Sequence, residues 1–219
     1  TDDDGYPDAL LKEQSKISIN FGSEGDNDTG DYISVGALPE SDIYTVSIWF
    51  KVKSGTWGGA LIGFGETNET NIYMANGVGG KDAIGFNTGS DDVYGVAGAQ
   101  SMLEDDEWHH LVAEFHANDM ASNKLWIDGV MQEISQQNGV TQDGPLENTL
   151  RIGLNNGGTH SWHGLIDEVA VWDKDLSEIE VSALYNSGYG LDVSVSQYAY
   201  GAEKDLIGYW TMDEGSGLT

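Results

Sequence analysis

Two adjacent carboxylates, Asp167 and Glu168, interrupt an otherwise apolar, β-forming run between Gly164 and Trp172. A run that is apolar on both faces indicates a central strand with packing on two sides. A carboxylate buried there is costly unless it is paired, hydrogen-bonded or bound to a cation. Strict alternation predicts one face with Leu165, Asp167, Val169 and Val171, and the other with Ile166, Glu168, Ala170 and Trp172.

A bound cation is the interpretation that we favour for Asp167, because basic partners are scarce. The chain has 37 Asp and Glu against 9 Lys and Arg, a formal charge of -28. The stretch from Gly22 to Asp31 also carries closely spaced carboxylates, and carboxylate oxygens are ligands that Ca²⁺ prefers. Taken alone, this stretch fits a solvated turn as well as a calcium site. Considered with Asp167, it favours calcium.

The segment just before Gly164 is rich in Gly, Asn and His and is a candidate ligand-binding loop. Aromatic rings pack on the apolar faces of sugars, and amides and carboxylates hydrogen-bond to hydroxyl groups. Each residue taken singly also has a simpler explanation, as core packing or as loop surface. The candidate ligand-binding residues are Trp162, His160, His163, Asn155, Asn156 and Trp57.

The composition excludes several classes of function. Nucleic-acid binding needs clustered Lys and Arg, which this chain lacks, and no apolar stretch is long enough to insert in a membrane. The absence of cysteine excludes a disulfide scaffold and a thiolate zinc site. The large negative charge opposes the compact state unless salt or bound cations offset it, which we interpret as adaptation to a saline or calcium-rich exterior.

Alternating apolar patterns joined by Gly-rich turns predict many strands, and one helix is expected near the C-terminus. Ser177–Glu180 is a capping box, and the helix is predicted to end near Gly188. Asp128-Gly129 is the strongest hairpin signal. We expect an acidic N-terminal segment over 1–15 and a single domain over 16–219.

The order of these motifs resembles the laminin-G-like jelly-roll family, within the concanavalin A-like lectin and glucanase superfamily. The resemblance covers roughly residues 16–188. It implies an all-β fold, a two-sheet antiparallel β-sandwich with one short helix near the C-terminus. The motifs that carry it are Thr45–Phe50, Trp108–Ala113, Leu125–Gly129, Ile152–Gly153 and Gly164–Val169.

Members of this family often carry Ca²⁺ near one edge of the sandwich. By position, the resemblance implies Asp31 and Asp167 as side-chain ligands, with a backbone carbonyl near Gly22. The acidic loop is longer than the usual family turn, so Asp26 or Asp28 is expected to replace or supplement Asp31.

The segment Leu206–Gly217 is similar to the strand that usually opens this family, but here it lies at the C-terminal end of the sequence. Two explanations remain open. The segment either begins a following repeat or folds back as the missing strand. We favour the second explanation, with residues 205–213 supplying a C-terminal strand.

Together these features predict a non-catalytic, calcium-dependent binding module, secreted or on the cell surface, that recognises glycan or peptide in cell adhesion. We expect a monomeric module within a larger chain. The alternative is a structural spacer in a large adhesin. A glycanase is less favoured, because Asp167 and Glu168 are predicted on opposite faces and cannot flank one glycosidic bond.

Overall fold

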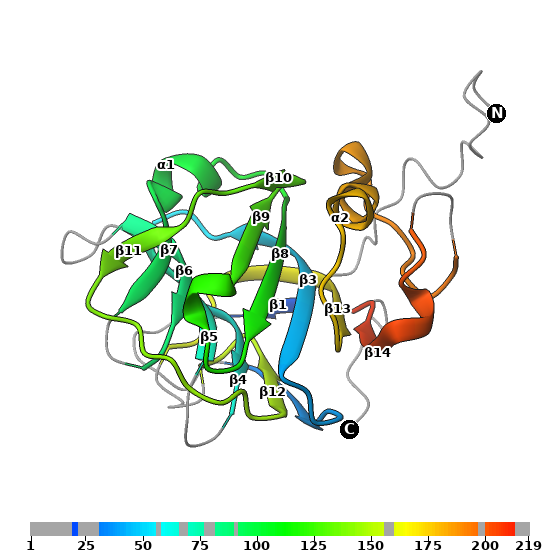
Figure 1. The fold of residues 1–219 in the computed structure, drawn as a ribbon. Coiled ribbons are helices and arrows are strands. Elements are labelled where there is room, and N and C mark those ends of the chain that lie inside the picture. Colours follow the sequence, from blue (N-terminus) through cyan, green and yellow to red (C-terminus); the bar gives the residue numbers. More distant parts are fainter. Residues whose placement is uncertain are drawn as a thin grey trace.

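Two antiparallel sheets pack face to face in the computed structural model and form a β-sandwich (Figure 1). The structure describes residues 19–21, 31–55, 58–65, 70–76, 82–89, 92–155, 160–196 and 200–212. Sheet A has the order β1-β13-β3-β8-β9-β10, with β14 also paired to β13, and sheet B has the order β11-β7-β6-β5-β4-β12-β2. The predicted fold class is therefore confirmed.

The strands of sheet A are β1 (Ile19–Phe21), β3 (Ile43–Val52), β8 (His109–His116), β9 (Lys124–Ile127), β10 (Val130–Met131), β13 (Gly164–Trp172) and β14 (Leu206–Trp210). Those of sheet B are β2 (Ile33–Ala37), β4 (Gly58–Phe64), β5 (Thr70–Asn76), β6 (Asp82–Asn87), β7 (Val93–Ala97), β11 (Ser135–Asn138) and β12 (Thr149–Ile152). The helical elements are α1 (Ala99–Leu103), η2 (Met120–Ser122), α2 (Glu178–Tyr185), η3 (Asn186–Gly188) and η4 (Glu203–Asp205).

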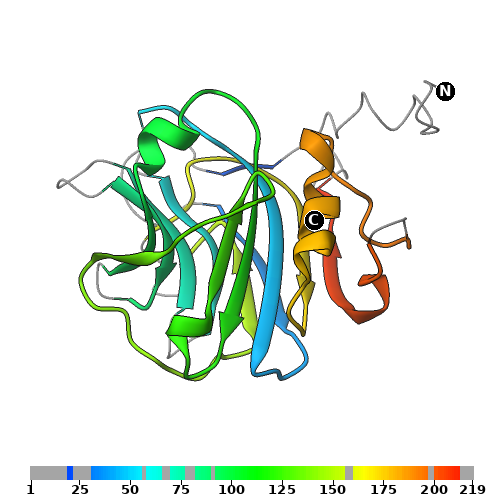
Figure 2. The same ribbon diagram turned by 45° about the horizontal axis from the view of Figure 1, so that its top comes forward.

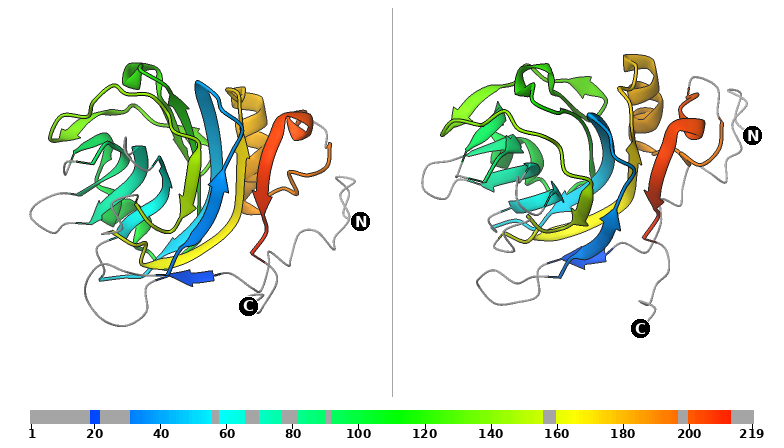
Figure 3. Two further views of the ribbon diagram at one scale, coloured as in Figure 1. Left: turned by 90° about the horizontal axis from the view of Figure 1, so that it is seen from below. Right: turned by 60° about the horizontal axis from the view of Figure 1, so that its bottom comes forward.

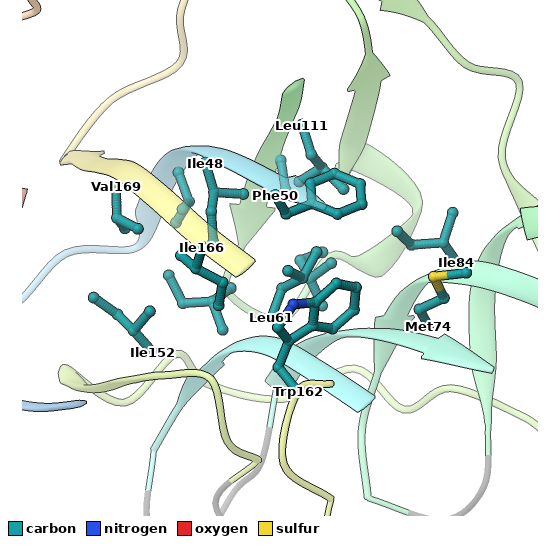
Figure 4. Packing of buried hydrophobic residues seen from close by; sticks show 14 of the residues in the cluster. Ile48, Phe50, Leu61, Met74, Ile84, Leu111, Ile152, Trp162, Ile166 and Val169 are labelled. Atoms are coloured by element: carbon teal, nitrogen blue, oxygen red, sulfur yellow. The ribbon is translucent and has the colours of Figure 1, made fainter. Parts of the chain in front are cut away.

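The main core lies between the two sheets. Alternate residues of β3, including Val46, Ile48 and Phe50, are fully buried and face sheet B. Figure 4 shows side chains from both sheets meeting there, with Trp162 pointing toward Phe50. Burial of this apolar surface is the dominant stabilising contribution to the fold.

A second apolar cluster covers the other face of sheet A. Helix α2 lies on the side of this sheet that faces away from sheet B (Figure 2; Figure 3). Val181 and Leu184 of α2 are buried against Trp172 of β13. The predicted capping box between Ser177 and Glu180 is present, and it begins the helix. The prediction that β13 packs on both faces is confirmed.

The predicted alternation along β13 is wrong beyond Asp167. Glu168 has a positive φ of 50° and sits where the register with β3 shifts, so the strand contains a β-bulge. This extra residue reverses the side-chain phase. Ile166 and Val169 therefore both face the main core, whereas Ala170 joins the second cluster with Trp172.

One edge of β13 is shared by two short strands from the two ends of the described chain. β1 pairs with the first part, Ile19 opposite Ile166, and β14 pairs with the second part, Trp210 opposite Val169. The change from β1 to β14 falls at the bulge. Tyr209 of β14 donates a hydrogen bond to the Glu168 carboxylate there.

The predicted Asp128-Gly129 turn joins β9 to β10. Both residues have positive φ, 50° and 73°, as a two-residue type I′ hairpin requires. This turn fixes the Asp128 carboxylate beside the first residues of β8.

Candidate functional site

The segment that links β12 to β13 lies directly on β4, and two glycines make this possible. A Cβ on Gly59 would collide with the carbonyl of Ser161, and one on Gly63 would crowd the carbonyl of Leu154. The backbones therefore approach more closely than any larger residue would allow. This contact holds the candidate ligand-binding loop against the outer face of sheet B.

His160 and Asn155 lie together at the base of this loop. The Asn155 side-chain oxygen accepts a hydrogen bond of 3.0 Å from the His160 backbone N–H. The His160 ring is edge-on to Tyr73 of β5, with ring centroids 5.5 Å apart and planes at 85°. His160 is exposed and Tyr73 is partly exposed. The structure thus joins two residues proposed from the sequence to an aromatic ring that sequence analysis missed.

Buried amides continue the polar surface behind Tyr73. Asn71 of β5 is opposite Asn87 of β6, and the two side chains are 3.4 Å apart (Nδ2 to Oδ1). Asn87 also donates to the backbone carbonyl of Asp92 at 2.7 Å. The Asn71 Oδ1 atom is buried without a hydrogen-bond partner among the described residues. Polar side chains are therefore built into this end of sheet B and fixed by one another.

Trp162 does not belong to the exposed surface. It is fully buried and its ring is edge-on to Phe50 at 5.6 Å, so it offers no face to a ligand. Its position follows from the chain direction: the loop re-enters the sandwich after Ser161 and carries the next side chain into the core. His163 is partly exposed. Asn156 and Trp57 lie outside the described residues.

The two described candidate calcium ligands belong to different sheets. Asp31 is exposed and lies two residues before β2 of sheet B. Asp167 is 5% exposed, lies on β13 of sheet A, and its Oδ1 accepts a hydrogen bond of 3.0 Å from the Glu168 N–H. Asp26, Asp28 and Gly22 lie outside the described residues, so the rest of the expected ligand set is not seen.

Two histidine–carboxylate clusters at the ends of β8 were not found by sequence analysis. At the start, His109 contacts Asp128 at 2.8 Å and Asp105 at 3.1 Å. At the end, Glu114 and His116 approach Asp175, which precedes α2. The Glu-x-His pattern on a strand places Glu114 and His116 on one face. No pattern in the sequence of β8 predicts that Asp175 lies beside them.

An open groove lies between the connection from β2 to β3 and the connection from β11 to β12. No aromatic side chain lines it, which makes it a less suitable sugar-binding surface than the region around Tyr73. Its lining residues are Glu40, Ser41, Asp42, Leu146, Glu147, Asn148 and Thr149.

Solved structures with the same fold come from proteins of several kinds. A candidate carbohydrate-binding protein from Bacteroides ovatus has a TM-score of 0.60 and 15% identity, covering 94% of this chain and 53% of that chain. A heptameric SAP-like pentraxin from Limulus polyphemus has a TM-score of 0.55 and 16% identity, covering 79% of this chain and 83% of that chain. The enzymatically active domain of tailspike protein 2 from bacteriophage CBA120 has a TM-score of 0.62 and 13% identity, covering 90% and 30%.

This chain thus spans about half of the Bacteroides protein (53%) and under a third of the phage protein (30%). No curated protein matches its sequence. Among the described residues, none of the helices has the length and apolar character that a membrane span needs. The family model for laminin-G-like domains of the concanavalin A-like lectin/glucanases superfamily matches residues 26–182, and the chain belongs to this family.

Proposed function

We propose that this chain is a non-catalytic glycan-binding module whose sugar-contacting surface is formed by His160, Tyr73 and Asn155. The observation that carries the proposal is the contact between an exposed imidazole and a partly exposed aromatic ring, with the buried Asn155 amide (8% exposed) bonded to the His160 backbone. An aromatic ring packs on the C–H face of a sugar and the imidazole bonds its hydroxyl groups, while Asn155 holds His160 in position.

The fixed backbone under these residues supports the proposal. Because the loop lies directly on Gly59 and Gly63, His160 is held in place before any ligand arrives. A preformed surface loses little conformational freedom on binding, so more of the contact free energy contributes to affinity. The proposed role is adhesion to glycans outside the cell, in a secreted or surface-attached protein.

Binding to a panel of oligosaccharides tests this function. Tyr73→Ala and His160→Ala should each weaken binding by tenfold or more, since about 1.4 kcal/mol of lost contact corresponds to one factor of ten. Tyr189→Ala is the matched control, because Tyr189 is an exposed tyrosine (51%) beyond α2, far along the chain. It should bind as the wild type does.

The same assay separates the alternatives. If no glycan binds to the folded protein, the structural-spacer hypothesis replaces this one. If oligosaccharides are bound and then shortened, the domain is a glycanase, and the non-catalytic part of the proposal is wrong.

We also propose that the domain binds Ca²⁺, held by Asp167 and Asp31 with Asp26, Asp28 and the Gly22 carbonyl. Burial of the Asp167 carboxylate (5% exposed) is compatible with a cation site, because a buried charge needs compensation. The donor set is oxygen, as Ca²⁺ prefers. A bound ion would neutralise part of the acidic loop and fix it to the sandwich.

Thermal unfolding with Ca²⁺ and with excess chelator tests the ion. A ligand that binds only the folded state raises stability by about 2.7 kcal/mol at a hundredfold excess over Kd. Asp167→Asn should abolish the calcium-dependent rise in Tm. An equal rise in wild type and variant would remove Asp167 from the site.

A further inference from the structure

The end of β8 carries a compact group of metal-ligating side chains. Glu114 and His116 are two residues apart on the strand, so both project from the outer face of sheet A. Asp175 reaches the same point from the turn between β13 and α2. One ligand atom from each residue lies within 4.8 Å of the other two. Three ligands from two segments thus meet at one point.

The imidazole of His116 is poorly hydrogen-bonded at one nitrogen. Its Nε2 is buried and has no hydrogen-bond partner among the described residues, although Asp175 Oδ1 is only 3.2 Å away. A buried nitrogen this close to a carboxylate without a good hydrogen bond is poorly satisfied as it stands. A cation bound between the three side chains would be coordinated by this nitrogen.

The charges around this point favour a cation. Lys124, opposite Glu114 on β9, bonds the Glu114 carboxylate at 2.7 Å and also faces Asp175 and Glu178. One ammonium therefore faces three carboxylates. Glu114 is fully buried and held by the Leu176 N–H at 2.9 Å, which fixes the carboxylate in position.

We propose that Glu114, His116 and Asp175 form a binding site for a divalent transition-metal ion such as Zn²⁺. One imidazole nitrogen with two carboxylate oxygens suits zinc and its neighbours, whereas calcium prefers oxygen alone. Asp175 is 43% exposed, so an ion has a path from solvent. The ion would join β8 to the segment that leads into α2. This site is separate from the proposed glycan surface and does not depend on it.

Zinc uptake by the chelator-treated, dialysed protein tests the proposal. Equilibrium dialysis is done in excess Ca²⁺, so that sites made of oxygen alone are already filled. We expect saturable binding of one Zn²⁺ per chain and a Tm that rises with zinc concentration. Co²⁺ should give a visible absorption spectrum that indicates nitrogen and oxygen ligands. If zinc binds without Ca²⁺ but not in excess Ca²⁺, the proposal is overturned.

Two substitutions locate the ion. His116→Ala and Asp175→Asn should each weaken zinc binding by at least about tenfold, because even residues that only orient metal ligands contribute that much. Asp173→Asn, an exposed acid two residues away on the same turn, is the control and should bind as the wild type does. If all three variants bind equally, the zinc lies elsewhere and the proposal is wrong. Asp175 is exposed enough to be replaced without unfolding the domain.

Lys124→Gln provides a test with the opposite sign. It removes a competing cation, so zinc should bind several-fold more tightly and should raise Tm more than in the wild type. Unchanged or weaker zinc binding in this variant would contradict the site.

Discussion

The two ends of β8 each place one histidine between two carboxylates, but the two clusters differ in how the ring is satisfied. At the start, both ring nitrogens of His109 have partners, Asp128 at 2.8 Å and Asp105 at 3.1 Å. At the end, His116 Nε2 has no hydrogen-bond partner among the described residues. The Glu114 carboxylate bonds to Lys124 and not to this histidine. The same residue types therefore form a closed cluster at one end and an open one at the other.

This difference separates a proton site from a metal site. When both nitrogens of a ring meet carboxylates, the charged imidazolium is the favoured form, since each nitrogen then donates. Burial alone would lower the pKa of His109, but Asp128 and Asp105 outweigh it, and the pKa lies above its ordinary value. The His116 ring, whose buried Nε2 has no hydrogen-bond partner among the described residues, is instead suited to coordination.

The largest expected effect is at the open end. Lys124→Met would leave the fully buried Glu114 carboxylate without its cation and should lower the free energy of unfolding by about 3 kcal/mol, the lower end for breaking a buried pair. We choose the lower end because the Lys124 side chain is 37% exposed. Chemical denaturation measures the loss.

The double variant Lys124→Met/Glu114→Gln sharpens this prediction. It removes the stranded charge and should be more stable than Lys124→Met alone, because burial by itself raises the pKa of Glu114. Asp106→Asn breaks an ion pair whose acid is 87% exposed and serves as the surface control, with a loss below about 1 kcal/mol. Additive losses in the double variant would contradict this account of Glu114.

The closed end should show a smaller loss. Asp128 accepts hydrogen bonds from His109 and from the His110 N–H at 2.9 Å. Asp128→Ala should cost about 2 kcal/mol, about 1 kcal/mol for each bond, because the carboxylate is 32% exposed. Asp105 is 50% exposed, and Asp105→Ala should cost less than about 1 kcal/mol. Equal losses would mean that the two carboxylates hold His109 equally.

Much of the fold follows from the sequence, because alternation and turn chemistry are local signals. Patterns in Thr45–Phe50 and Leu125–Gly129 correctly predicted β3 and the turn after β9, and the Ser177 capping box correctly predicted α2. The bulge at Glu168 was missed, since one left-handed residue changes every later side chain without changing the apolar pattern.

The candidate sites were less predictable, because they join distant segments. Asn155 and His160 belong to one loop and were both proposed from the sequence, but Tyr73 approaches them only through the pairing of β4 with β5. Glu114 and His116 share one face of a strand, but the sequence analysis did not single them out. Their third partner, Asp175, is brought there by the turn into α2, which no local pattern specifies.

The pH dependence of the closed end tests the same contrast, because two adjacent histidines act there with opposite sign. His109 has a raised pKa, so its contribution is complete below the unfolded value of about 6.5 and is lost as pH rises through the folded pKa. Burial lowers the pKa of His110 to about 3, so its contribution is present above about 6.5 and is lost as pH falls. Thermal unfolding between pH 5 and 8 should therefore show maximum stability near pH 6.5. In His109→Gln the decline above pH 6.5 should disappear while the decline below it remains. If the variant keeps the alkaline decline, His109 is not the group that titrates there, and the contrast between the two ends of β8 lies in their hydrogen bonding alone.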